Sequence, residues 1–198
     1  MHDVLDLCVR PRATIRRILE RDPRRYVLGL IILESYTVAD KFMSGRFAEL
    51  LPLALLRPVA IALTPLVLLP AVYAVAGLLE ISGRALGGRA TSLEIRAVLA
   101  WAGIPMLAWL AMRIQVAALA GDPGLALHGI LEVDPQTRAT LDSALQVLVV
   151  PASIWELVLR YHGLCEAQAF SGLRLIASVL LAIAIPVVPA VIAALLLT

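Results

Sequence analysis

Ionisable side chains inside apolar stretches are the residues of this sequence best placed to do chemistry. A charged group at membrane depth is costly, so each one indicates an ion pair, an ion route or a ligand contact. Glu156 and Arg160 lie four residues apart and can pair on one helix face. The full set of intramembrane polar candidates is Glu34, Asp40, Arg113, Asp142, Glu156 and Arg160.

Glu34 is the most informative member of this set. At about 1.5 Å per helical residue it lies about 13 Å above Arg25, and by this count no basic residue shares its depth. Pro105 and Pro151 lie at nearly the same level, and each frees a carbonyl four residues earlier. The carboxyl could hold a proton, a cation or a polar headgroup. It could equally donate one hydrogen bond, as a protonated Glu, to a neighbouring helix, and we favour that structural interpretation.

Three charged residues are expected near the opposite interface. The same depth count brings Asp40, Arg113 and Asp142 to similar levels, where they could form an ion cluster between helices. A paired cluster would be kept because none of these charges can be left alone in the membrane. Alternatively, Asp40 and Arg113 could line a polar route together with Glu34.

A second polar group follows Arg160 and contains His162, Cys165 and Glu166. These residue types could bind zinc or form a thiol nucleophile, but no second cluster with ligand spacing accompanies them. Paired carboxylates, or a base beside a nucleophile, are also absent at recognisable spacing. We therefore expect no enzymatic activity, no metal site and no cofactor.

Five apolar blocks must position these side chains. The chain has 198 residues, of which 61% are hydrophobic and 16% charged, with a mean hydropathy of +0.89. A hydrocarbon core of about 30 Å needs about 20 apolar helical residues, and lipid offers the backbone no hydrogen-bond partners. The sequence therefore predicts an all-α polytopic membrane protein, a bundle of five transmembrane helices. They cover residues 26–43, 58–82, 95–120, 139–163 and 173–197.

The distribution of basic residues predicts the topology. Twelve lie on the side of the first residue and four on the other side. Because positive charge near span ends stays cytoplasmic, the N-terminus is expected in the cytoplasm. Five crossings then place the C-terminus outside, in a multi-pass protein of the cell inner membrane.

Residues 1–25 form a separate basic, amphipathic cytoplasmic segment ahead of the membrane domain at 26–198. Within it, residues 11–22 predict a short interfacial helix with an apolar stripe of Ile15, Ile18 and Leu19. Such a helix would lie on the membrane surface as an anchor, or dock a cytosolic partner.

Arginines on this face are expected to contact anionic lipid headgroups or a protein partner. They are Arg12, Arg16, Arg17, Arg21, Arg84 and Arg89. Nucleic acid is not an expected partner of this membrane protein.

Three motifs occur in an order that resembles a known family. Pro11-Arg-Ala-Thr14-Ile15 opens the amphipathic helix, and a turn at 87–92 leads into the span that contains Pro105. A stretch from Trp155 through Glu166 to Arg174 then precedes the last helix. This order resembles the bacterial branch of the Yip family, the Ypt/Rab-interacting membrane proteins.

The resemblance implies five helices with a cytoplasmic N-terminus. Since no catalytic spacing occurs, we expect a non-enzymatic role in membrane organisation or as a partner-binding scaffold, with a homo-oligomer as one form. Eukaryotic relatives bind Rab-type GTPases through a longer cytosolic segment with an Asp-Leu-Tyr-Gly-Pro signature. This chain lacks that signature, so a Rab partner is not expected. The alternative function is a small transporter or ion pathway through Glu34, Asp40 and Arg113.

Overall fold

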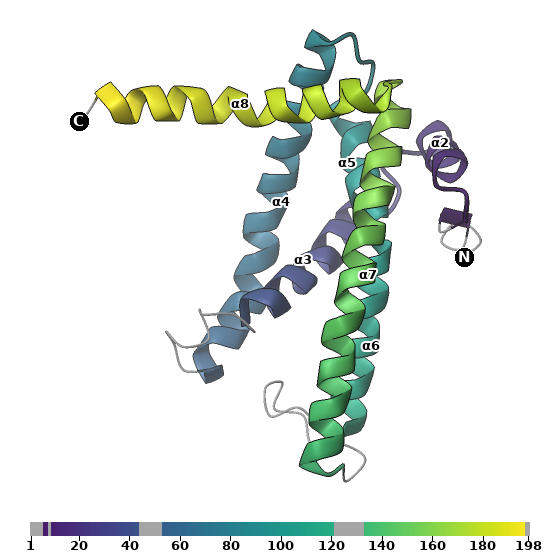
Figure 1. Cartoon of the computed structure of the whole chain (residues 1–198), viewed down its shortest axis with the longest axis vertical. Helices are drawn as coiled ribbons and strands as arrows, with labels where there is room; N and C mark the ends of the chain where they lie inside the picture. Colours follow the sequence, from purple (N-terminus) through teal and green to yellow (C-terminus); the bar gives the residue numbers. More distant parts are fainter. Residues whose placement is uncertain (1–5, 8, 44–52, 121–132, 197–198) are drawn as a thin grey trace.

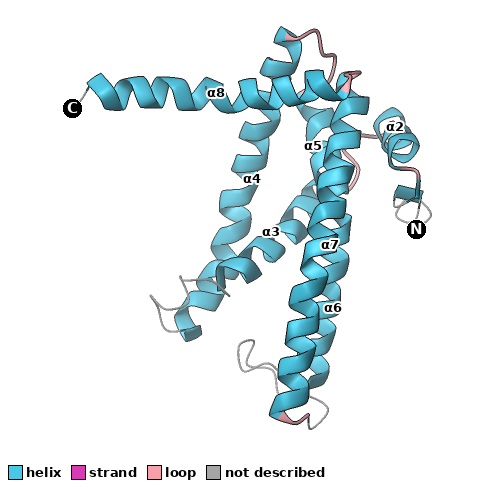
Figure 2. Cartoon of the chain, in the orientation of Figure 1, coloured by secondary structure: helices cyan, strands magenta, loops and turns pink. Residues whose placement is uncertain are grey.

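A computed structural model describes residues 6–7, 9–43, 53–120 and 133–196 of the protein. Within these ranges the ordered elements are helices, and no strand occurs (Figure 2). The helices are α2 (Pro11–Arg21), α3 (Val27–Met43), α4 (Leu53–Ala85), α5 (Ser92–Ala102), α6 (Ile104–Ala120), α7 (Pro135–Gln168) and α8 (Gly172–Leu196).

Four of the helical stretches are long and apolar enough to cross a membrane. They are Val59–Ala85, Ser92–Ala120, Pro135–Gln168 and Gly172–Val191. A shorter apolar helix covers Val27–Ala39, within the first predicted block. The prediction of an all-α polytopic membrane protein is thus confirmed, whereas the count of five crossings stays a prediction.

The ends of these helices are fixed by local chemistry. Thr91 and Glu94 form a capping box that begins α5. Asp134 caps α7 by accepting from the backbone N–H groups of Gln136 and Thr137, each at 3.0 Å. Ala169 adopts a left-handed conformation with φ 56°, which ends α7 and allows the turn into α8.

The packed core lies at one end of the bundle, which we call the α2 end. The α2 end comprises α2 and the turns at 86–91 and 169–171, and it lies towards the top of Figure 1. Helices α2, α4, α5, α7 and α8 all contribute buried side chains there. The buried cluster includes Ile15, Leu79, Ile95 and Leu159 from these helices, with Leu7 and Phe170 from outside them.

Helix α5 and its continuation α6 are the central element. Half of the most apolar stretch of Ser92–Ala120 is buried within the protein, against 6% for Val59–Ala85 and for Pro135–Gln168. Away from the α2 end, α6 and α7 run side by side as a pair (Figure 1). The outer parts of α4 and α7 therefore expose apolar side chains that suit a lipid environment.

Helix α8 runs crosswise to α4 and α7 (Figure 1). Its first half packs on α4, where the hydroxyls of Ser82 and Ser178 are hydrogen-bonded at 3.0 Å. Beyond Ala182 its described side chains face away from the core. The placement of the C-terminus outside the cell remains a prediction.

Candidate functional site

An ion cluster joins α3 to α7 inside the apolar part of the bundle. The Arg160 guanidinium contacts both Glu34 and Glu156, with its Nη2 2.5 Å from Glu34 Oε1. Glu156 and Arg160 pair across one turn of α7, as their spacing predicts. Glu34 itself is only 8% exposed. The cluster thus ties α3 to the last third of α7 through the long arginine side chain.

The break between α5 and α6 makes room for the Glu34 carboxyl. A Cβ added at Gly103 would lie 2.9 Å from Glu34 Cδ and 3.0 Å from its Oε2. Pro105, two residues after this glycine, cannot supply a backbone N–H to the Trp101 carbonyl, and the Gly103 N–H donates to the Ala100 carbonyl at 3.3 Å. Gly103 therefore serves as the point where the α5–α6 backbone can approach a carboxyl from another helix.

The expectation that Glu34 has no basic residue at its depth is wrong, because Arg160 pairs with it. The depth count treated every helix as perpendicular to the membrane, but α3 runs obliquely and packs on α4, α5 and α6 (Figure 1). The long arginine side chain covers the remaining difference in depth. The Glu34 carboxyl therefore accepts a hydrogen bond from the Arg160 guanidinium, and whether it is protonated stays a prediction.

The second predicted cluster is not tested by the described residues. The Asp40 side chain lies outside them. Asp142 is exposed on α7. The Arg113 guanidinium lies 6.0 Å from the centre of the Trp109 ring, within range of a cation–π contact. A lock of Asp40, Arg113 and Asp142 remains a prediction.

Helix α2 begins at Pro11, as predicted, but its apolar stripe is not on a membrane surface. Ile15 is 1% exposed and Ile18 is 8% exposed, and both pack inside the protein. A Cβ added at Gly163 would lie 2.7 Å from Ile15 Cδ1, so this glycine forms the notch that α2 enters. The expected interfacial position of the stripe is therefore corrected to a protein contact, because the ends of α5 and α7 offer it an apolar surface.

Two arginines of α2 bind the polar end of α7. Arg12 Nε donates to His162 Nδ1 at 3.2 Å, and Arg16 Nε donates to Glu166 Oε1 at 2.6 Å. Helix α7 continues through Gly163, which places His162 and Glu166 on the face that α2 covers. Another basic residue of α2, Arg17, pairs with Asp6 at 3.0 Å. No three His, Cys, Asp or Glu side chains of the described chain gather as a metal site.

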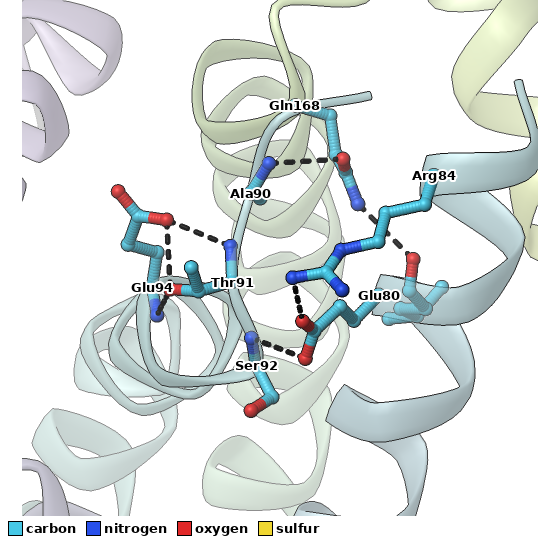
Figure 3. A network of polar contacts seen from close by, with 8 residues as sticks. Glu80, Arg84, Ala90, Thr91, Ser92, Glu94 and Gln168 are labelled. Atoms are coloured by element: carbon cyan, nitrogen blue, oxygen red, sulfur yellow. Dashed lines mark hydrogen bonds and ion pairs between the residues drawn. The ribbon is translucent and has the colours of Figure 1, made fainter. Parts of the chain in front are cut away.

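Figure 3 shows a third polar network, at the turn between α4 and α5. Arg84 pairs with Glu80 at 2.6 Å, and Glu80 also accepts the Ser92 backbone N–H at 2.9 Å. Buried Gln168, from the end of α7, accepts the Ala90 backbone N–H at 3.3 Å and donates to the Leu79 carbonyl at 3.1 Å. The network holds the ends of α4, α5 and α7 together.

Glycines at the end of α4 and in the following turn make room for Gln168 and Phe170. A Cβ at Gly83 would lie 2.7 Å from Gln168 Cδ, and one at Gly88 would lie 2.8 Å from Phe170 Cζ. Gly87 adopts φ 84°, a left-handed conformation that favours glycine. The Gly87-Gly88 pair therefore serves close packing, and Arg89 after it stays exposed.

Sequence reasoning missed Gln168, Gly103 and Gly163 as site residues. Each is a small or amide residue within or just after an apolar block, and its neighbours in the sequence do not indicate which side chain it contacts. The arginine candidates separate into two groups. Arg12, Arg16, Arg17 and Arg84 contact polar groups of the protein, whereas for Arg21 and Arg89 the structure establishes exposure alone.

Comparison with known proteins gives one match. No curated protein and no solved structure matches the chain. The sequence does match the Yip1 domain over residues 5–195, which is nearly its whole length, and the chain therefore belongs to the Yip1 domain family of membrane proteins.

Proposed function

We propose that this protein is a non-enzymatic membrane scaffold that organises the bilayer or binds a partner through its α2 end. The α2 end faces the cytoplasm in this proposal, in agreement with the charge distribution of the sequence. The observation that carries it is the pairing of the intramembrane charges. Glu34, Glu156 and Arg160 contact one another between packed helices, which is the arrangement of a structural lock.

The surface available to a partner is the outer face of α2 with the neighbouring turn. The inner face is held by Arg12 and Arg16 on α7, so α2 is presented in one fixed orientation. Exposed residues on the outer side include Ala13, Glu20 and Arg21. A rigid, charged helix face of this kind suits a protein partner or anionic headgroups.

A second candidate function is a proton or cation pathway, favoured by the charge of the ion cluster. Two carboxylates share one guanidinium, which leaves one negative charge in excess when both carboxylates are ionised. An excess charge inside a membrane span attracts a proton or a cation. Three further points are also part of what we propose: a homo-oligomer, membership of the bacterial branch of the family, and location in the inner membrane.

One experiment separates the two candidates. A photo-crosslinking residue is placed in intact membranes at Ala13 or Glu20, with exposed Asp142 at the opposite end as control. The scaffold predicts a discrete adduct from α2 and none from Asp142. In liposomes it predicts that proton flux equals that of protein-free vesicles. Flux that Glu34→Gln abolishes, with no adduct from α2, would establish the pathway instead.

A further inference from the structure

A cavity of about 670 Å³ lies at the corner where α2 turns into α3. Its walls come from the end of α2, the turn at 22–26, the start of α3 and the α5–α6 junction. Binding sites for small ligands in proteins usually have volumes of about 300–1,000 Å³. The cavity is therefore large enough to take a substantial part of a lipid molecule.

The mouth of the cavity is basic. Arg21 and Arg25 line it, with Asp22 as the acidic residue among the lining side chains. Asp22 Oδ1 accepts the Arg24 backbone N–H at 2.9 Å, which ties this carboxylate to its own turn. Arg25 donates to the Tyr26 hydroxyl at 2.9 Å, and within the described chain no ion pair joins Arg21 or Arg25 to a carboxylate. With two guanidinium groups and one carboxylate, the mouth carries a net positive charge and therefore favours an anionic ligand.

The floor of the cavity is apolar. Leu30 of α3 and Ile104, Leu107 and Ala108 of α6 form it. Both helices run from the α2 end into the apolar part of the bundle, so the floor continues from the charged mouth towards the membrane interior (Figure 1). A charged mouth over an apolar floor matches a molecule with an anionic head and a hydrocarbon chain.

Two aromatic residues complete the wall. Tyr26 adopts φ 63°, a left-handed conformation that is strained for a bulky side chain. Its ring meets Trp101 edge to face, with centroids 6.4 Å apart. Trp101 is 8% exposed, and its Nε1 has no acceptor in the described part of the protein. Because Nε1 is shielded from the cavity surface, these two residues contribute an aromatic wall to the cavity.

We propose that this cavity binds one anionic glycerophospholipid from the leaflet at the α2 end. The phosphate lies between Arg21 and Arg25, and one acyl chain follows Leu30, Ile104 and Leu107. The inference rests on the proposed function only in taking the α2 end as the cytoplasmic side, where anionic lipids are available. The lipid would stabilise the angle between α2 and α3, because it contacts both helices and the turn that joins them.

The test measures lipid retained by the purified full-length protein in mild detergent, by native mass spectrometry. Phosphatidylglycerol and phosphatidylcholine of equal chain length are titrated separately, together with glycerol 3-phosphate as a free headgroup. The proposal expects one phosphatidylglycerol per chain, bound about tenfold or more tightly than phosphatidylcholine, since hydrogen bonds to charged groups are stronger than those between neutral groups. Glycerol 3-phosphate should bind far more weakly, because it cannot use the apolar floor.

Two variants and a matched control assign the binding to the cavity. The double variant Arg21→Gln/Arg25→Gln should remove the preference for phosphatidylglycerol. Arg24→Gln/Arg89→Gln removes the same charge from exposed positions outside the cavity and should keep that preference. Ala108→Phe fills the floor without changing charge, and should weaken phosphatidylglycerol binding about tenfold while both basic residues remain.

Equal binding of the two lipids, or equal loss in the double variant and its control, would overturn the proposal. Tight binding of glycerol 3-phosphate would reduce the site to a headgroup site and contradict the acyl-chain assignment. None of these readouts involves a protein partner or proton flux. Failure of the lipid site is therefore distinguishable from failure of the scaffold function.

Discussion

The α2 end and the opposite end of the bundle are built by different means. At the α2 end five helices share a buried core, and ion pairs and a buried amide join their ends. Towards the opposite end, α6 and α7 continue as a pair, and many apolar side chains face outward. There the Trp109 Nε1 donates to the Leu145 carbonyl at 2.9 Å, a buried polar contact between these two helices.

The difference shows which part of the molecule must keep one fixed geometry. Apolar contacts between helices resemble helix–lipid contacts in strength, so apolar faces alone leave helix orientation loosely set. Polar contacts with defined partners set it more strictly. The α2 end has such contacts between α2, α3, α4, α5 and α7, and this is the end that we propose binds partners and lipid.

Of the substitutions that compare the two ends, removal of Arg160 should lower the free energy of unfolding most. Arg160→Met leaves Glu34 and Glu156 without their guanidinium, and breaking a buried ion pair costs about 3–5 kcal/mol. Because part of the Arg160 side chain is exposed, we expect about 3 kcal/mol, measured by unfolding in mixed micelles. Arg84→Met breaks an exposed pair with Glu80 and should cost at most about 1 kcal/mol. Equal losses would show that the two pairs contribute alike.

Filling the notch for α2 should have the next largest effect. Gly163→Leu puts a side chain against Ile15 and Val98, and overpacking of this kind costs about 1–3 kcal/mol. We expect α2 to separate from α7, so a maleimide should label a cysteine introduced at buried Thr14. Gly77→Leu is the matched control, because no atom lies within 4 Å of a Cβ built there. Unchanged labelling in Gly163→Leu would contradict the docked position of α2.

At the opposite end a single hydrogen bond can be tested. Trp109→Phe removes the donor to the Leu145 carbonyl, and we expect a loss of about 1 kcal/mol. Hydrogen exchange should rise in the outer parts of α6 and α7 and stay constant at the α2 end. Trp155→Phe, at an exposed tryptophan of α7, should change neither region. A rise that extends to α2 would show that the two ends unfold as one unit.

The smallest expected effect concerns acidification at the start of α7. Hydrogen bonds from the side chain and backbone of Thr137 hold the pKa of Asp134 below its usual range. The folded pKa is the lower one, so the cap stabilises α7 above the ordinary value of about 3.9 and is lost as the pH falls through the folded value. Amide exchange at Gln136 should therefore rise on acidification. Asp134→Asn keeps an acceptor and should remove this pH dependence; a cap that weakened as the pH rose would contradict the assignment.

Helix positions could be predicted from the sequence because hydropathy and capping are local. Each apolar block lies within or beside a helix, and the start at Pro11 agrees with the structure. The apolar stripe of Ile15 and Ile18 was also identified correctly, but the surface that covers it was not. A local pattern indicates that a face will be buried, and does not say whether lipid or protein covers it.

The ion cluster could not be predicted because it depends on helix tilt. Counting residues gives depth only for helices perpendicular to the membrane, and α3 runs obliquely (Figure 1). The contact of Glu34 with Gly103 depends further on a break between α5 and α6, which a continuous apolar block conceals. The Glu156–Arg160 pair lies on one helix, so its spacing was enough.

The most direct test of a locked, charge-paired bundle is a double-mutant cycle on Glu34 and Arg160. The free energy of unfolding is measured for the wild type, Glu34→Gln, Arg160→Met and the double variant. Residues in contact commonly show coupling energies of about 0.5–3 kcal/mol, and we predict about 2 kcal/mol for this pair. Additivity within about 0.5 kcal/mol would mean that the two residues do not interact in the membrane, and would contradict the lock.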